Sequence, residues 1–406
     1  MRISTSQLYN SGVSTIQQQY ADLQKLQQQL ASGKRMLTPS DNPIAAANAL
    51  EVSQSISTNQ QYTSNAGSAY DTLSQQEAVL GQVNDVLQNA RDVIVSAGNG
   101  TLSDTQRANM ATTIKGYYDQ LVGLANSTDS NGQYIFAGNK GSTLPFTELS
   151  TGNVTYNGDQ GQLKLQISAS RQIAVSSSGA QVFQLIRSGN GTFTTAANGA
   201  NTGTGLATAG TVQSQSAWAG SSKNFQVKFT SPTTYDVIDN GSATTLVSGA
   251  TYTSGASITI PGAGAQFNIS GAPATGDVFT LQASSTNQDI FSTLGALMTT
   301  LNTPASTPTS NAALNNGLRT ALSNLDQAQA NALSVRSNVG TAMNEVTAQQ
   351  TTLSNLSTQY QATLSGLQDL DYAKAASDFS LKQVSLTAAQ KSFVQVQGLS
   401  LFNYIN

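Results

Sequence analysis

The stretch that decides the fold is LRTALSNLDQAQANALSVRSNVGTAMNEVTAQQTTLSNLSTQYQATLSGLQDL, residues 318–370. Apolar side chains recur seven residues apart at Leu318, Leu325, Ala332, Val339, Val346, Leu353, Tyr360 and Leu367. A sevenfold repeat of this kind predicts a helix whose apolar stripe packs against other helices. At ~1.5 Å per residue the helix is roughly 80 Å long, which is too long for it to fold back on itself as a compact bundle.

A second apolar stripe begins after a shift in phase. The step from Leu367 to Tyr372 spans Asp369-Leu370-Asp371, so the first stripe does not continue through it. We expect a separate C-terminal helix from about residue 372, followed by the end segment Gly398-Leu-Ser-Leu-Phe-Asn-Tyr-Ile-Asn406. The apolar positions expected at this end of the chain are Tyr372, Phe379, Leu386, Phe393, Leu401 and Phe402.

The N-terminal residues carry the same sevenfold period. Its members are Ile16, Leu23, Leu30 and Leu37. Gly33, Pro39 and Pro43 then end this helix, and Asp41-Asn42-Pro43 favours a new helix start.

Two more helices are expected before residue 130. The first runs from about Ile44 to Ala97 and ends at Gly98-Asn99-Gly100, and its stripe consists of Ala66, Leu73, Leu80, Leu87 and Ile94. The second begins with Ser103-x-x-Gln106, which is the spacing of a capping box, and ends near Asn126.

The period changes between Asn131 and about Ser285. Short β-branched or aromatic runs separated by turns predict strands at residues 133–136, 163–167, 225–229, 235–238 and 277–281. Asn157-Gly158 and Asp239-Asn240-Gly241 are typical of hairpin turns. Residues 188–222 contain no charged residue and are rich in Gly, Thr and Ala, so we expect a surface loop or a weakly ordered insert there.

A helical pattern returns at Asp289 and stops at a break between Pro304 and Pro308. The predicted fold is therefore α + β, with long antiparallel helical arms from both termini enclosing a projecting, hairpin-rich all-β middle domain. The expected parts are an N-terminal polymerisation helix (1–43), the two halves of a helical rod (44–130 and 287–370), the β domain (131–286) and a C-terminal polymerisation helix (371–406).

The composition excludes several kinds of chemistry. The chain has 406 residues with 18 Lys+Arg, 21 Asp+Glu, no His and no Cys, so thiolate and imidazole sites are ruled out. Only 10% of the residues are charged, against roughly 25% in an ordinary protein, and the balance of −3 does not favour nucleic acid. We expect no catalytic site, metal or cofactor. The candidate carboxylates are Asp277 and the pair Asp236 and Asp239, and the members of this pair lie three apart around a hairpin turn, where acids are usually solvated.

The heptads alone favour packing within the chain. For the helix at 318–370 we expect packing against the second helix, in a rod core made of Leu73, Leu80, Leu87, Ile94, Leu318, Leu325, Val339, Val346, Leu353, Tyr360 and Leu367. For residues 1–40 and 372–406 packing between subunits is the better hypothesis, because a lone pair of such helices is marginal and has few charges to set its register. We expect these ends to become ordered on assembly.

Both ends of the chain resemble a known family. Met1-Arg-Ile-Ser-Thr-Ser-Gln-Leu-Tyr9, Leu26-Gln-Gln-Gln-Leu-Ala-Ser-Gly-Lys-Arg-Met-Leu-Thr-Pro-Ser-Asp-Asn-Pro43 and the end Gly398-Leu-Ser-Leu-Phe-Asn-Tyr-Ile405 are similar to the flagellin superfamily, and most similar to its hook-associated protein 3 branch. The matches cover roughly the first 140 and last 110 residues. The alternatives within the superfamily are flagellin and hook-associated protein 1; a secreted coiled-coil adhesin or phage fibre is more remote.

The resemblance implies a structural role in the bacterial flagellum. Members of the branch form a homo-oligomeric ring between hook-associated protein 1 and the first flagellin subunits, with the terminal helices in an inner tube. They are exported unfolded by the flagellar type III apparatus, with an export chaperone and without a cleaved signal peptide. The implied location is extracellular, with neither membrane insertion nor nucleic acid as a partner.

Overall fold

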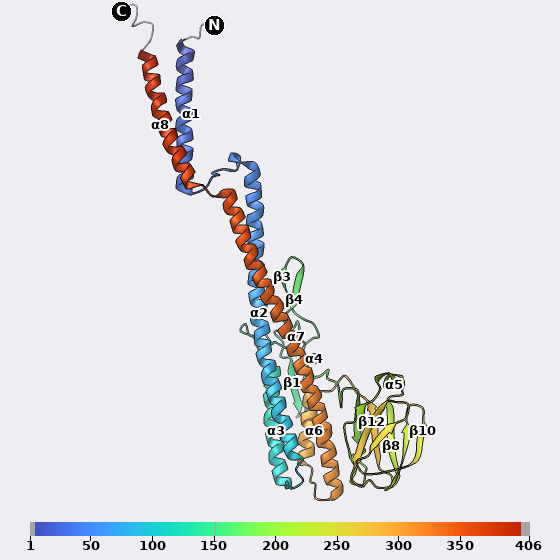
Figure 1. Cartoon of the computed structure of the whole chain (residues 1–406). Helices are drawn as coiled ribbons and strands as arrows, with labels where there is room; N and C mark the ends of the chain where they lie inside the picture. The colour runs from blue at the N-terminus through green and yellow to red at the C-terminus, as the bar shows by residue number, and fades with distance from the viewer. Residues whose placement is uncertain (1–4, 151, 399–406) are drawn as a thin grey trace, which may run out of the picture. The chain divides into compact units, whose positions relative to one another are not determined.

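The computed structural model describes residues 5–150 and 152–398, which divide into two compact units. Unit 1 is formed by the described parts of Met1–Ser64 and Gln349–Asn406, and unit 2 by those of Asn65–Ala348. Two long helices, α2 (Pro43–Ala97) and α7 (Pro308–Gln368), contribute residues to both units (Figure 1).

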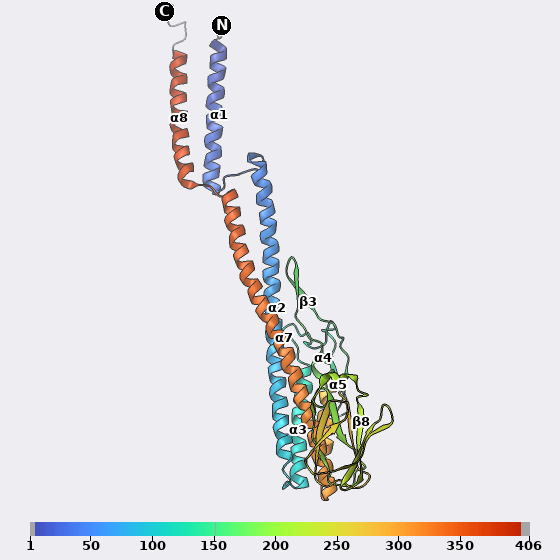
Figure 2. The same ribbon diagram turned by 45° about the vertical axis from the view of Figure 1, so that its right-hand side comes forward.

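Unit 1 contains the helices nearest the two ends of the chain. These are α1 (Thr5–Ser32) and α8 (Tyr372–Gly398), which lie side by side and antiparallel (Figure 2). The predicted N-terminal helix is shorter than its stripe, because Leu37 lies beyond its end. The chain leaves α1 at Gly33, whose φ of +69° is a left-handed conformation that glycine adopts without strain. A 3-10 turn, η1 (Pro39–Asp41), follows before α2.

The starts of α2 and α7 follow from local sequence. Each helix has a proline at its first position, where the missing N–H has no partner to lose. Asn42 Oδ1 accepts a hydrogen bond from the Ala45 N–H at 3.1 Å, as expected from the Asp-Asn-Pro signal. At α7, Ser310 N–H donates to Thr307 Oγ1 at 3.1 Å and Thr307 N–H donates to Ser310 Oγ at 2.9 Å.

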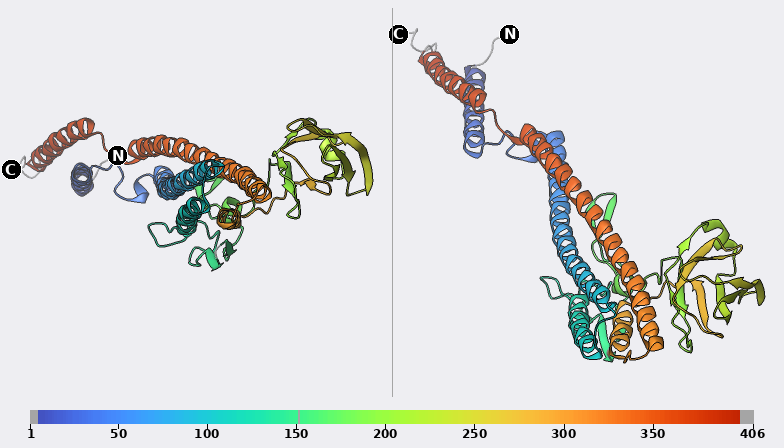
Figure 3. Two further views of the ribbon diagram at one scale, coloured as in Figure 1. Left: turned by 90° about the horizontal axis from the view of Figure 1, so that it is seen from below. Right: turned by 60° about the horizontal axis from the view of Figure 1, so that its bottom comes forward.

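The helical part of unit 2 contains α3 (Asp104–Ala125) and α6 (Ile290–Asn302) beside α2 and α7 (Figure 3). Ser103 and Gln106 form the predicted capping box at the start of α3, and Asp289 caps α6 through the N–H groups of Phe291 and Ser292. The rod-core positions that fall in unit 2 are all buried. They are Leu73, Leu80, Leu87, Ile94, Leu318, Leu325, Val339 and Val346.

The first part of the region predicted as the β domain, up to Phe183, forms short elements around an aromatic cluster, and the name β domain is used below for β5 to β13. The elements are β1 (Phe146–Ser150), β2 (Asn153–Tyr156), β3 (Lys164–Ser168), β4 (Arg171–Ala174) and α4 (Gly179–Phe183). Fully buried rings of Tyr118, Phe136, Phe146, Phe183 and Phe291 pack with centroids 5.3–6.0 Å apart.

Two predictions in this region, one strand and one hairpin turn, were wrong. Residues 133–136 make only an isolated bridge, Thr128 to Tyr134, because Phe136 faces the aromatic cluster instead of extending a sheet. Asn157-Gly158 does not turn a hairpin, since β1 pairs with β2 and β3 pairs with β4. The Asn157 side chain instead donates to Thr147 Oγ1 at 2.8 Å, which links the residue after β2 to β1.

The β domain contains two antiparallel sheets over one core. The larger has the order β10 (Thr244–Thr251), β9 (Thr234–Asp239), β8 (Asn224–Ser231), β13 (Val278–Ala283) and β5 (Phe193–Ala197). The smaller contains β11 (Ser257–Ile260), β12 (Ala265–Ser270), β6 (Leu206–Ala207) and β7 (Thr211–Val212). The predicted strands at 225–229, 235–238 and 277–281 and the turn at Asp239-Asn240-Gly241 are confirmed, and Phe225, Val227, Phe229 and Phe279 fill the core.

The uncharged segment 188–222 is not the loop that its composition predicts. It supplies β5, β6, β7 and the short helix α5 (Gln215–Gly220), and its only large rings, Phe193 and Trp218, are buried in the core with centroids 5.3 Å apart. Its polarity is carried by Thr, Asn and Gly, which pair through backbone and amide groups. The segment therefore has regular structure although it carries no charge, and Phe193 and Trp218 anchor it in the core.

Candidate assembly surfaces

The predicted terminal stripes meet each other inside unit 1. Ile16, Leu23 and Leu30 on α1 are half-buried, as are Phe379 and Phe393 on α8, and Leu386 is only 8% exposed. The Tyr9 and Phe393 rings lie 5.3 Å apart, and Lys382 Nζ lies 2.6 Å from Asp22 Oδ2. Because these pairs run antiparallel, a charge pair and an aromatic pair together determine the register of α1 against α8.

The remaining predicted positions behave differently. Tyr372 begins α8 and is exposed, and Leu37 is half-buried in the segment between α1 and α2. Leu401 and Phe402 lie outside the residues that the structure describes.

A second apolar face of α8 was missed in the sequence. Leu381 and Val384 are 63% and 68% exposed, and at about 100° per residue they lie about 140° and 160° around the axis from Leu386. Val394 on α8 and Tyr20 on α1 are also exposed. The spacing of Leu381, Val384 and Ala388 was the signal that was overlooked, because it does not share the sevenfold phase of the Phe379 stripe.

The residues that link α1 to α2 and α7 to α8 are hydrogen-bonded to each other. Arg35 N–H donates to the Gln368 carbonyl at 2.7 Å, and Leu370 N–H donates to the Gly33 carbonyl at 2.9 Å. The Arg35 guanidinium adds a bond to the Leu367 carbonyl at 2.9 Å. The two connecting segments therefore form one short antiparallel bridge. Within unit 1, this bridge restricts the directions that α1 and α8 can take where they join α2 and α7.

Asp41 links the end of α1 to the segment that follows it. Lys25 Nζ lies 2.6 Å from its Oδ1, and the Leu37 and Thr38 N–H groups donate to its Oδ2 at 2.9 and 3.0 Å. The Lys25 hydrogen bond and the two backbone donors lower the pKa of Asp41 from 3.8 to about 2. Beside this turn, Ile44 and Leu50 of α2 are largely exposed.

The rod-core positions in unit 1 are less deeply buried than those in unit 2. Leu353 is buried, whereas Tyr360 and Leu367 are half-buried. In unit 2, α2 and α7 are also joined by charge. Arg91 Nε lies 2.8 Å from Asp326 Oδ1, and Arg336 Nε donates to Glu77 Oε1 at 3.1 Å. The register of this pair thus rests on interhelical ion pairs as well as on apolar packing.

Asp277 lies in a network of backbone hydrogen bonds in the β domain. It is buried, and its oxygens accept hydrogen bonds from the N–H groups of Thr202 (2.8 Å), Gly203 (3.1 Å) and Ala274 (2.9 Å). Asp236 accepts from Gly249 N–H, and Asp239 accepts from the turn at Gly241. Each of these acids accepts a hydrogen bond from at least one backbone N–H, and for Asp239 this bond lies within the turn between β9 and β10.

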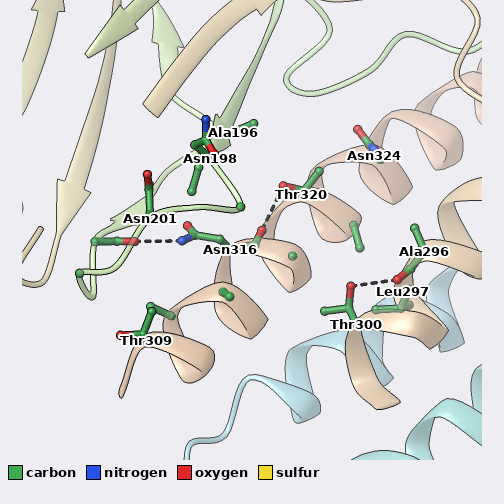
Figure 4. A pocket seen from close by; sticks show the side chains of 18 of the residues that line it. Ala196, Asn198, Asn201, Ala296, Leu297, Thr300, Thr309, Asn316, Thr320 and Asn324 are labelled. Carbon is green, nitrogen blue, oxygen red and sulfur yellow. Dashed lines mark hydrogen bonds between the residues drawn. The ribbon is translucent and has the colours of Figure 1, made fainter. Parts of the chain in front are cut away.

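A cavity of about 320 Å³ lies where the loop after β5 approaches α6 and α7 (Figure 4). Asn316 of α7 bridges its edge, since Nδ2 donates to the Gly205 carbonyl at 2.9 Å and Oδ1 accepts from Ala207 N–H at 3.0 Å. Its lining is made of Ala, Gly, Thr, Asn and Leu without a titratable group. No cluster of three acidic ligands occurs in residues 5–150 and 152–398, and no helix within those residues is long and apolar enough to cross a bilayer.

Comparison with known proteins gives consistent matches. Residues 3–141 match the bacterial flagellin N-terminal helical region, and residues 322–405 match the C-terminal helical region. Flagellar hook-associated protein 3 of Escherichia coli K12 is 32% identical over 410 residues, which is 99% of each chain. The protein of the same name from Salmonella typhimurium is 44% identical over 188 residues, which is 46% of this chain and 58% of the Salmonella protein.

The fold is found in a solved structure as well. FlgL from Xanthomonas campestris has a TM-score of 0.71 at 32% identity, over 77% of this chain and 99% of that one. This likeness confirms the predicted α + β fold, in which terminal helices enclose a β region along the sequence.

Proposed function

Since the chain belongs to the flagellar hook-associated protein 3 family, we propose that it is a structural subunit of the bacterial flagellum that joins the hook to the filament. The observation that carries the proposal is the full-length match. It spans the terminal helices and the middle of the chain alike, whereas a flagellin-like or hook-associated protein 1-like chain would share chiefly the ends.

The terminal helices supply the polymer contacts in this proposal. The α1–α8 pair buries one apolar face in the single chain and leaves Leu381 and Val384 uncovered on the other. Leu381 and Val384 share one face of α8, and an exposed apolar face is a candidate surface for another chain. We assign the outer face of α8 to neighbouring copies in a homo-oligomeric ring and the inner stripe, with Leu386, to the pairing of α1 and α8.

The partners and the route follow from the family. One side of the ring meets hook-associated protein 1 and the other meets the first flagellin subunits. The chain reaches this extracellular position unfolded, through the flagellar type III apparatus, with an export chaperone and without a cleaved signal peptide. The small number of charges and the absence of Cys support passage as an unfolded polypeptide, because no disulfide can form in transit.

The proposal is tested in a strain that lacks the gene. We expect such cells to make hooks, to lose flagellin into the medium and to regain filaments when the gene is restored. Leu23→Asp should not restore them, because it places a charge in the α1–α8 face, whereas Leu163→Asp, at an exposed position in unit 2, should. Filaments held firmly on the hooks of the deletion strain would show that the chain is not the junction.

A further inference from the structure

Gln76 on α2 is fully buried, and neither atom of its amide has a hydrogen-bond partner among the described residues. Other buried side chains with an unpartnered atom keep further hydrogen bonds: Arg107 donates to the Leu102 carbonyl, and Gln288 donates to the Asn324 carbonyl. Only Gln76 in residues 5–150 and 152–398 is recorded with both polar atoms unpartnered. Buried amides without partners are uncommon in folded proteins and call for an explanation.

The neighbours of Gln76 on its own face of α2 are apolar. It occupies a core position of α2 between Leu73 and Leu80, and both of these side chains are buried. The Glu77–Arg336 ion pair places this level of α2 opposite the part of α7 that carries the buried Val339. A water molecule needs two to four polar partners to be held in a core, and the side chains of Leu73, Leu80 and Val339 offer none.

Asn59 shows how a core amide is normally accommodated in this chain. It is also buried on α2, and its Nδ2 donates to the Leu353 carbonyl of α7 at 2.9 Å, within unit 1. Asn59 therefore gains a directional contact in return for its desolvation. Gln76 is desolvated without such a contact, so its layer of the core is weaker than an apolar layer would be.

We propose that Gln76 forms a weak layer in the core of unit 2, and that the part of α2 in unit 2 opens first at this layer when the chain is unfolded for export. Regions with the weakest packing open at the lowest free energy, and opening there exposes the rest of the core to unfolding. The inference rests on the proposed export of the chain as an unfolded polypeptide. In this proposal one residue lowers the stability of the folded chain enough for it to be unfolded for export.

The stability test uses the purified full chain with Gln76→Met, which keeps the side-chain length and removes the amide. The matched control is Gln82→Met, on the same helix but exposed. We expect the first variant to raise the Tm by about 2–8 °C and to slow amide exchange around residues 73–80 by about 5-fold or more. The control should change neither. An unchanged or lower Tm for both Gln76→Met and Gln76→Leu would overturn the proposal.

The export test follows the same variants in flagellated cells. Gln76→Met should reduce the amount of the chain that reaches the medium or the hook several-fold relative to Gln82→Met. A raised Tm with undiminished export would also overturn the proposal. The proposed function fails in a different way, namely if wild-type chain still appears outside cells that lack a working flagellar export apparatus, and the Tm and exchange results do not depend on that outcome.

Discussion

Leu386→Ala separates the pairing of the terminal helices from their packing between subunits. Leu386 is the most buried large side chain of the α1–α8 pair, and the antiparallel register given by Asp22–Lys382 places it opposite about residues 16–19 of α1. A two-helix interface that depends on so few buried side chains is marginal on its own. Loss of this side chain should therefore have a large effect on the local pairing.

The magnitude follows from burial. Replacing a buried Leu with Ala costs about 2–5 kcal/mol, and the lower end applies because the two-helix interface can collapse partly around the gap. A loss of about 2 kcal/mol lowers the equilibrium constant for pairing roughly 30-fold. Amide exchange along residues 372–396 should accelerate by a similar factor, which mass spectrometry of the purified full chain measures directly.

Leu381→Ala is the matched control. It removes the same atoms from the same helix, but Leu381 is largely exposed, so exchange in α8 should change less than threefold. If the outer face of α8 contacts neighbouring copies, Leu381→Ala should nevertheless lower incorporation into flagella. Unchanged exchange in Leu386→Ala would refute the assignment of Leu386 to pairing, and normal incorporation of Leu381→Ala would refute the assignment of the outer face.

Three further predictions concern single contacts. Phe291→Ala should lower the free energy of unfolding by about 3–5 kcal/mol in urea denaturation, because its ring is fully buried among other rings, whereas Leu333→Ala should stay within about 0.5 kcal/mol; equal losses would contradict this account. Gly12→Ala should speed amide exchange in α8, because a Cβ at this position would lie 2.6 Å from the Phe393 ring. This effect opposes the higher helix propensity of Ala. Slower exchange in α8 would mean that the ring moves aside freely. The pKa of Asp41 is lowered in the folded chain, so the stability that its carboxylate contributes is complete above pH of about 4 and is lost as the pH falls through about 2. Amide exchange of the Thr38 N–H, followed against pH, measures this loss. A loss of protection already near pH 5 would contradict the prediction.

The helices were predictable because their signals are local. Sevenfold stripes, the prolines before α2 and α7 and the capping box at Ser103 each act within one or two turns of a helix, and all reappear in the structure. The end of α1 at Gly33 was predicted, but Leu37 was wrongly counted in its stripe, because Leu37 keeps the sevenfold period after Gly33 has turned the chain. Apolar residues can keep the sevenfold spacing beyond the end of a helix, so the spacing alone does not locate that end.

The β region was less predictable because its order depends on distant contacts. The uncharged segment lacks charge, but it is anchored by Phe193 and Trp218, whose partners come from β8 and its neighbours in the core. Likewise, residues 133–136 have the composition of a strand, yet Phe136 packs against Phe183. These contacts join residues far apart in the sequence, so a pattern read over about ten residues does not predict them.

The assembly surfaces were predicted only in part, for a related reason. The stripe with Phe379 and Leu386 is periodic and was found, whereas Leu381 and Val384 form a second face that becomes visible only when the first has been assigned a partner. Gln76 was passed over because an amide at one heptad position is unremarkable until its burial is known.

The most direct test of the central claim is to locate the chain on isolated hook–filament complexes with a gold-labelled antibody against its β domain. The account predicts one narrow band of label where hook and filament meet, and no band in complexes from the deletion strain. Label distributed along the filament would make the chain a filament subunit and would contradict the account.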